Sequence, residues 1–158
     1  MRRGQRIRLR LAYECRAAAR GLSRGAASSH RVHGSRARKR RDIAPNCRWE
    51  SWANNRAQRQ GVPTLQPRTG PAGVADFFAV VGELQMHDFQ VLDVIAGERQ
   101  VAVEVVIDYS MPGGGRLRDE ELHLWTLDEH QRVVRLRHYV DTAKHIAAYA
   151  GEDTTTEN

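Results

Sequence analysis

The sequence predicts an α+β fold, in which a curved antiparallel sheet has helices packed on one side and is preceded by a basic segment that packs poorly. Three observations predict it. The charge balance changes sign near residue 42, a helical apolar stripe follows residue 70, and four strand-like segments with short connections follow that stripe. The part after residue 41 has about 117 residues, which is enough for one independent core.

The charge divides the chain into two parts. Residues 1–41 hold 13 Arg, one Lys and a single acidic residue, Glu14. Residues 42–158 hold 11 basic and 18 acidic side chains, so the formal net charge of +6 describes neither part. Basic side chains bind nucleic acid by releasing counterions from its phosphates, so we expect nucleic-acid contact only through residues 1–41. The acidic charge of the second part argues against such contact there.

The basic segment has one predicted element. The spacing of Ile7, Leu11 and Leu22 predicts an amphipathic helix near 6–22, with arginines on its opposite side. The basic run at 36–41 should stay extended and solvated. Four interpretations remain open: a tail without a specific role, which includes a misassigned start; an organelle transit peptide; a nucleic-acid or nuclear-targeting arm; and a first helix of the domain. Tyr13 is the only Phe, Trp or Tyr among the arginines, which argues against base stacking.

Other bulk features bear on location. No apolar run reaches 18 residues, so no membrane span is predicted. No apolar h-region follows the first arginines, which argues against a secretory signal peptide. Cys15 and Cys47 match no metal-binding spacing, and reduced thiols are their simplest interpretation. We therefore expect a cytoplasmic protein, with an organelle as the alternative that a transit peptide would require.

The first elements of the acidic part are a strand, a loop and a helix. Residues 47–52 have the aromatic and β-preferring character of a short strand, and 53–70 has the low periodicity of a long loop. Pro71 suits the first turn of a helix that should reach about residue 85. Its apolar residues follow the spacing of a buried stripe, which favours core positions over a cofactor site for both phenylalanines: Val74, Phe77, Phe78, Val81 and Leu84.

Four strands and a last helix complete the predicted domain, which spans 42–151. The strands cover 89–95, 100–109, 120–127 and 132–140, and their short connections require antiparallel pairing. Asp141 is a good N-cap for a helix that reaches about residue 150, where Gly151 is a stop signal. The acidic end, 152–158, should fray.

The order of these elements resembles a known superfamily. Together with the segments GPAGVADFF at 70–78 and VVRLRHYVDT at 133–142, it resembles the SnoaL-like branch of the nuclear transport factor 2 superfamily, which also contains ketosteroid isomerase. The resemblance covers about residues 43–150 and implies a cystatin-like cone with a small-molecule pocket, on a scaffold that hosts many functions. It also implies a homodimer formed through the outer face of the sheet. Family members begin with one or two amphipathic helices, whereas this chain begins with the basic segment.

The resemblance implies a set of site residues, with Tyr139 and Asp141 facing the pocket. Asp141 or Glu104 would act as base and Tyr139 or His123 as donor, because a buried carboxylate of raised pKa can accept a proton from a carbon beside a carbonyl. Four further residues would bind the substrate: Trp49, Phe78, Trp125 and Arg137. No cofactor is expected, and the histidines lack HExxH or other ligand spacing, so no metal site is expected either.

Each of these residues also has a structural interpretation. A strand face with Arg135, Arg137, Tyr139 and Asp141 is typical of a solvated sheet surface with cross-strand ion pairs. Asp141 could serve only as a helix cap, and His123 as a hydrogen-bonded core or surface residue. On the strand at 120–127, the same alternation groups three residues on one face: Glu121, His123 and Trp125.

Three functions are consistent with these patterns. The first is an acid–base enzyme of isomerase, dehydratase, cyclase or hydrolase type, which acts without a cofactor on a small apolar or carbonyl-containing ligand. The second is a non-catalytic ligand-binding or dimerisation module of the same fold, and the third is a nucleic-acid-associated protein that uses residues 1–41. A closed cavity with a perturbed carboxylate beside Tyr139 would favour the first function, and a filled or open cone the second.

Overall fold

The computed structural model describes residues 43–51 and 55–156, so the helix predicted near 6–22 lies outside the described residues. Within this part, the elements in chain order are β1 (Ile43–Ser51), α3 (Arg56–Arg59), the 3-10 turn η1 (Pro63–Leu65), β2 (Arg68–Thr69), α4 (Gly70–Gly82), β3 (Gln85–Ala96), β4 (Gln100–Ser110), β5 (Arg116–Leu127), β6 (Val133–Tyr139) and α5 (Thr142–Tyr149). The predicted α+β class is confirmed. No described helix is long and apolar enough to cross a membrane.

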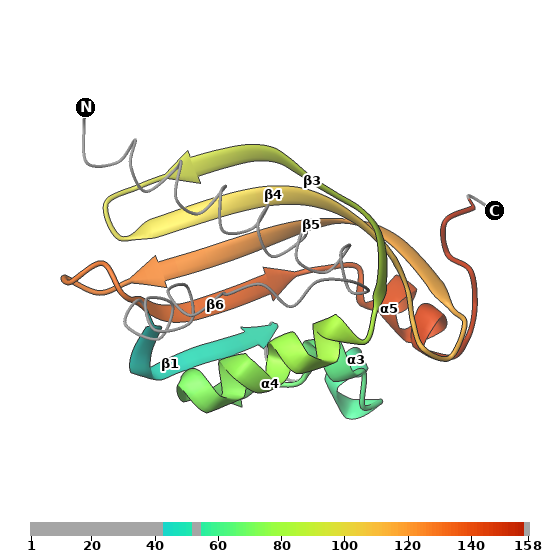
Figure 1. Cartoon of the computed structure of the whole chain (residues 1–158). Helices are drawn as coiled ribbons and strands as arrows, with labels where there is room; N and C mark the ends of the chain where they lie inside the picture. The colour runs from blue at the N-terminus through green and yellow to red at the C-terminus, as the bar shows by residue number, and fades with distance from the viewer. Residues whose placement is uncertain (1–42, 52–54, 157–158) are drawn as a thin grey trace, which may run out of the picture.

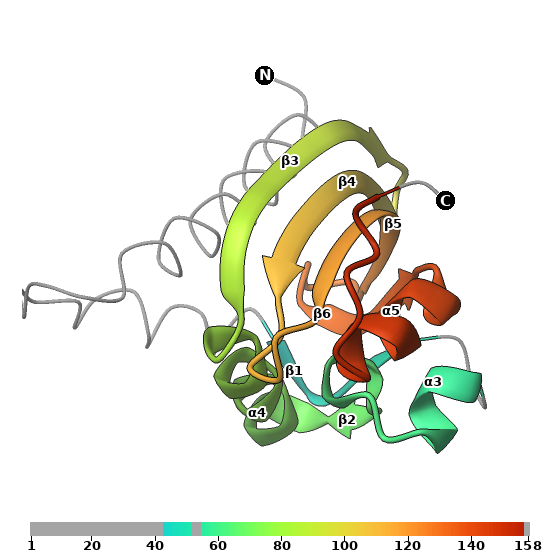
Figure 2. The ribbon, with the colours of Figure 1, turned by 90° about the vertical axis from the view of Figure 1, so that its right-hand side faces the viewer.

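The strands of the described part form one six-stranded curved sheet in the order β2-β1-β6-β5-β4-β3 (Figures 1 and 2). β3 to β6 pair with their chain neighbours in antiparallel fashion, as their short connections predict. β1 instead pairs with β6 in parallel, with Trp49 opposite Leu136. The sequence pattern does not predict this pairing, because the two strands lie far apart in the chain.

The first predicted strand and the predicted loop differ most from the structure. β1 begins at Ile43 rather than at residue 47, and its described part ends at Ser51. The segment predicted as a loop contains α3, η1 and the short strand β2, which pairs with β1. The side chain of Asn55 caps α3 by accepting a hydrogen bond from the backbone N–H of Gln58 at 2.9 Å. These short elements bring Leu65 into a small core with Ala57 and Val62.

Helix α4 starts at a tight backbone turn. Gly70 has a φ of +70°, in the left-handed region that favours glycine, and a Cβ there would lie 2.9 Å from the backbone oxygen of Pro45. A larger residue would therefore push α4 away from β1. Phe77 is buried against the sheet, whereas Phe78 is 43% exposed. The expectation that both phenylalanines belong to the core is therefore wrong for Phe78.

The helices pack on one face of the sheet. We call it the inner face and define it by five side chains of β1, β5 and β6: Trp49, His123, Trp125, Leu136 and His138. α4 contacts this face through Phe77, whose ring centroid lies 5.2 Å from that of Trp49. α5 contacts it through His145, whose ring lies 3.1 Å from a carboxylate oxygen of Glu121. The outer face carries the alternate residues of the same strands.

The chain beyond α5 continues along the start of β5. The backbone N–H of Arg116 donates to the carbonyl oxygen of Glu152, and the N–H of Thr154 donates to the carbonyl oxygen of Arg116. Asp153 forms a bridge with Arg116. Residues 152–154 therefore extend the sheet locally, whereas the sequence pattern predicts fraying from residue 152.

Candidate functional site

A group of buried or partly buried polar side chains lies on the inner face. We call it the inner polar cluster and define it by six residues from β4, β5, β6 and α5: Tyr109, Asp119, Glu121, His123, His138 and His145. The alternation of β5 places three of them on one face at every second position. Tyr109 and His145 are each only 2% exposed, and the side chain of His123 is 13% exposed. His123 is therefore the most accessible of these three cluster members.

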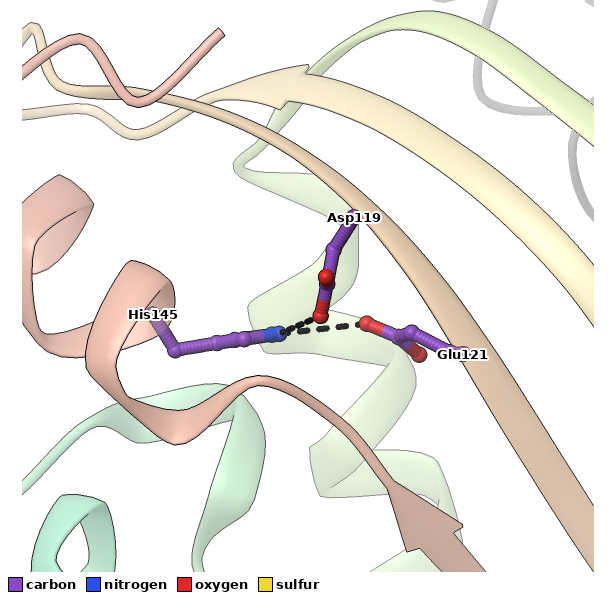
Figure 3. A group of neighbouring side chains, drawn as sticks. All are labelled: Asp119, Glu121 and His145. Atoms are coloured by element: carbon purple, nitrogen blue, oxygen red, sulfur yellow. Dashed lines mark hydrogen bonds and ion pairs between the residues drawn. The ribbon is translucent and has the colours of Figure 1, made fainter. Parts of the chain in front are cut away.

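Helix α5 carries His145 over the two carboxylates of β5, as Figure 3 shows. Nε2 of His145 lies 3.1 Å from Oε1 of Glu121 and 3.7 Å from Oδ2 of Asp119. Nδ1 of the same ring lies 3.3 Å from the hydroxyl of Tyr109. The start of α5 is held as well, because Asp141 caps it and donates its backbone N–H to Asp119 at 2.9 Å.

His123 forms the other side of the cluster. Its Nε2 lies 2.7 Å from Oε2 of Glu121, and its ring stacks on that of His138 with a centroid distance of 4.6 Å. A carboxylate can only accept a hydrogen bond, so Nε2 of His123 must carry a proton and donate it. Nδ1 of a neutral His123 ring then holds a lone pair, and it makes no hydrogen bond within the described residues.

The environment changes the pKa of three cluster members: Glu121, His138 and Tyr109. Burial alone would raise the pKa of Glu121, but hydrogen bonds from His123 and His145 outweigh burial and hold that pKa well below its usual value. Burial, with the nearby charge of His123, lowers the pKa of His138 to about 3, so this ring is neutral at neutral pH. Burial also raises the pKa of Tyr109 well above its usual value, and the hydroxyl therefore remains a donor.

Asp119 differs from its neighbour Glu121. Burial raises the pKa of Asp119, and the charge of Glu121 adds to this effect, while the hydrogen bond from the N–H of Asp141 opposes it. Two carboxylates in one buried place disfavour each other's ionisation. The donor atoms of Asp119, Glu121 and His145 all lie within 4.8 Å of one another, so these three side chains could together hold a metal ion.

An aromatic wall adjoins the cluster. The ring of Trp49 lies 5.4 Å from that of Trp125 and 6.3 Å from that of His138, and Phe77 lies 5.6 Å from His138. The indole N–H groups of Trp49 and Trp125 are buried and lack a hydrogen-bond partner in the described part of the chain. The inner face therefore combines flat apolar surfaces, two indole donors and the lone pair of His123.

A separate depression of about 380 Å³ lies along the side of α5 that carries Ile146 and Ala147. Arg56 and Glu152 complete its lining with other residues of α5, and no member of the inner polar cluster contributes to it. The chemistry and the depression are therefore in different places, and the cluster is the candidate site because it holds the reactive groups.

The residues that the resemblance implies are divided between the two faces. Trp49, Trp125 and His123 lie together on the inner face, and Phe78 lies at its margin with its ring 5.7 Å from that of Trp49. Glu104 pairs with Leu122 on the outer face.

Tyr139, Arg137 and Asp141 also lie away from the inner face. Tyr139 is 38% exposed opposite Leu122, and Arg137 contacts Glu50 on the same outer face. Asp141 is the N-cap of α5, and its carboxylate accepts from the N–H groups of Ala143 and Lys144. The expectation that Tyr139 and Asp141 face the interior is therefore wrong in position, because the alternation of β6 turns its inner face to His138.

Sequence reasoning did not single out four other members of the cluster as site residues: Tyr109, Asp119, His138 and His145. Glu121 was grouped with His123 and Trp125 by strand alternation, and Asp119 continues that same alternation by one step. His145 and Ala148 are three positions apart and share the buried side of α5. This helical spacing is the sequence pattern that could have predicted a buried histidine.

Comparison with known proteins supports the fold. No family model matches the sequence, and no curated protein is significantly similar to it. A protein from Rhodopseudomonas palustris described as a candidate isomerase is 17% identical, with 90% of this chain and 96% of that chain covered and a TM-score of 0.64. An NTF2-like protein from Burkholderia xenovorans LB400 is 16% identical, with 89% and 93% covered and a TM-score of 0.60.

A candidate SnoaL-like polyketide cyclase from Jannaschia sp. CCS1 is 18% identical, with 86% of this chain and 91% of that chain covered and a TM-score of 0.55. At such identities the matches show the fold alone. The chain therefore has the nuclear transport factor 2-like fold to which the SnoaL-like and ketosteroid isomerase-like proteins belong, as the resemblance implies.

Proposed function

We propose that the domain binds a small carbonyl-containing molecule at the inner face and exchanges a proton with it through His123. The observation that carries this proposal is the position of the His123 ring. Glu121 holds Nε2 at 2.7 Å, so Nδ1 of His123 is left as an acceptor. The His123 side chain is also more accessible than that of Glu121. A general base needs such an oriented lone pair within reach of the proton that it abstracts.

The proposed step uses groups that lie on one face. Nδ1 of His123 accepts a proton from the carbon beside the carbonyl, the electrons of that C–H bond move onto the carbonyl oxygen, and the proton later returns to the ligand. The negative charge of Glu121 stabilises the imidazolium that forms. The indole N–H groups of Trp49 and Trp125, which have no partner among the described residues, supply donors for the oxygen.

The aromatic wall favours a flat, largely apolar ligand. The rings of Trp49 and Phe77 contact the neutral ring of His138, and Trp125 contacts Trp49. Such surfaces bind apolar ligands while a few polar groups fix their orientation. The descriptions of two matched proteins, as a candidate isomerase and a candidate polyketide cyclase, name enzyme classes that act on small molecules and support this choice.

The test uses 2-acetonaphthone, a flat aromatic ketone, as the probe. Exchange of its methyl protons in D₂O is followed by NMR with the full chain. We expect the protein to accelerate the exchange and His123→Gln to lower the accelerated rate by about 100-fold or more. His130→Gln, in the exposed turn between β5 and β6, is the matched control and should leave the rate unchanged.

Equal rates for His123→Gln and the wild-type chain would contradict the proposed role of His123. Binding of the probe without exchange, measured by tryptophan fluorescence, would instead support the non-catalytic ligand-binding module. Absence of both binding and exchange would contradict the proposed site for this class of ligand.

A further inference from the structure

Three side chains of the inner polar cluster point toward one another: Asp119 and Glu121 from β5, and His145 from α5 (Figure 3). Each offers one atom that could coordinate a metal ion. Nε2 of His145 lies 3.1 Å from Oε1 of Glu121 and 3.7 Å from Oδ2 of Asp119. Ligand atoms that bind one ion at about 2.1 Å lie about 3 to 4 Å from one another. The spacing of these atoms is therefore close to that of a coordination sphere.

Asp119 is the less well compensated of the two buried carboxylates at this place. Asp119 and Glu121 are each 5% exposed, and they lie two positions apart on the same face of β5. Nε2 of His145 lies near both carboxylates, Nε2 of His123 also serves Glu121 at 2.7 Å, and Nζ of Lys144 lies 3.8 Å from Oδ1 of Asp119. Buried carboxylates need hydrogen bonds and a counter-charge, and a divalent cation would supply that charge.

Each of the three side chains also contacts a further polar group, as metal ligands in proteins usually do. Nδ1 of His145 contacts the hydroxyl of Tyr109, and Oε2 of Glu121 accepts from His123. Asp119 accepts from the backbone N–H of Asp141. Such outer partners fix the orientation of ligating histidines and carboxylates in metal sites. Each candidate ligand here has one.

We propose that Asp119, Glu121 and His145 bind a divalent transition-metal ion, of which Zn²⁺ and Mn²⁺ are the types that suit two carboxylate oxygens and one imidazole nitrogen. In a metal-bound neutral ring the lone pair of Nε2 would face the ion, so the single ring proton would sit on Nδ1 and be donated to the oxygen of Tyr109. Three protein ligands leave a coordination position for water or a ligand oxygen. This inference deepens the proposed function because it concerns the same site, but it does not depend on proton transfer by His123.

Cation titration of the full chain after EDTA treatment tests the proposal. Zn²⁺ binding is measured by calorimetry, and the visible absorption of Co²⁺ reports the coordination of the bound ion. We expect Asp119→Asn and His145→Gln each to weaken binding at this site by about 100-fold, and Tyr109→Phe to weaken it by about 10-fold. Two exposed side chains provide matched controls: Glu120→Gln on the opposite side of β5 and His130→Gln should bind as the wild-type chain does.

Equal affinity of His145→Gln and the wild-type chain, or no binding by the wild-type chain, would overturn the proposal. Crystals of the wild-type chain with Zn²⁺ give a second measurement that does not depend on the folding of any variant. An anomalous peak between the three side chains supports the site, and its absence at saturating Zn²⁺ overturns it. Ketone exchange by the EDTA-treated chain separates the two proposals: exchange without Zn²⁺ binding refutes this inference alone, and Zn²⁺ binding without exchange refutes the proposed function alone.

Discussion

The two faces of β6 accommodate polar residues in two different ways. Towards the inner face, His138 stacks on His123 and Leu136 is completely buried. Towards the outer face, Arg135 and Arg137 alternate with these residues and remain partly exposed. A shift of one position therefore separates a buried, reactive environment from a surface network. The chemical nature of a residue alone does not reveal which of the two it belongs to.

The outer face balances its charges through one carboxylate. Oε1 of Glu50 lies 2.9 Å from Arg48, 3.0 Å from Arg135 and 3.2 Å from Arg137. Burial would raise the pKa of Glu50, but the hydrogen bond and charge of Arg48, with those of Arg137 and Arg135, outweigh burial and lower it. Here each charged group has an opposite charge in contact. On the inner face, Asp119 and Glu121 share His145, Glu121 also accepts from Nε2 of His123, and Nδ1 of His123 stays open to a ligand.

The largest expected effect is on ketone exchange, and it distinguishes Glu121→Gln on the inner face from Tyr139→Phe on the outer face. An amide can donate to His123 and stabilise the wrong tautomer, so ketone exchange should fall by about 100-fold or more. Tyr139 lies on the outer face, and its Phe variant should exchange within about twofold of the wild-type chain. The NMR exchange assay measures both. A large loss with Tyr139→Phe and none with Glu121→Gln would reverse the assignment of the faces.

The next effect is on stability and uses the same substitution on each face. Leu136→Ala creates a cavity beneath Trp49 and should lower the free energy of unfolding by about 3 kcal/mol. Leu122→Ala, on the exposed outer side of β5, should lower it by less than about 1 kcal/mol. Urea denaturation followed by circular dichroism measures the two values. Similar losses would indicate that the outer side of β5 is as tightly packed as the core.

A smaller effect concerns pH. The pKa of Glu50 is lower in the folded chain than its usual 4.5, so the unfolded chain binds more protons. The stabilisation by Glu50 is therefore present above pH 4.5 and is lost as the pH falls through the lowered value. Glu50→Gln should therefore cost about 1 kcal/mol at pH 7 and progressively less in acid. Urea titrations at several pH values test this, with the exposed Glu98→Gln as control. A constant difference across pH would exclude the ion pairs as its cause.

The smallest effect separates capping from catalysis at Asp141. Asp141→Ala should cost about 1 kcal/mol through loss of the α5 cap, whereas Asn caps nearly as well as Asp and should preserve stability. Ketone exchange by Asp141→Asn should match that of the wild-type chain because the carboxylate caps α5 away from the inner face. Loss of exchange in a stable Asp141→Asn chain would restore the catalytic role that the resemblance implies.

Much of the fold follows from local patterns. The buried stripe over 74–81 predicts α4, the alternation over 100–109 predicts β4, and Asp141 predicts the start of α5. Each pattern reflects an interaction within a few residues along the chain. The parallel pairing of β1 with β6 could not be predicted in this way, since it joins residues that no local pattern relates.

The site was predictable only in part for a related reason. Strand alternation groups Glu121 with His123, but it does not say whether their side of the strand meets helices or water. The position of His145 is set by where α5 packs, which depends on the cap at Asp141 and on the Asp119 contact. On β6 the resemblance implies that the row with Arg137 and Tyr139 faces the pocket. Helix packing buries the other row instead.

The parallel pairing of β1 and β6 has a consequence for synthesis of the chain. Glu50 and Arg137 contact each other although 87 positions separate them. A ribosome releases β1 well before β6, so the nascent chain holds an interior strand without its main neighbour until translation is nearly complete. Truncation before Val133 would leave Trp49 without Leu136, its partner in the buried cluster.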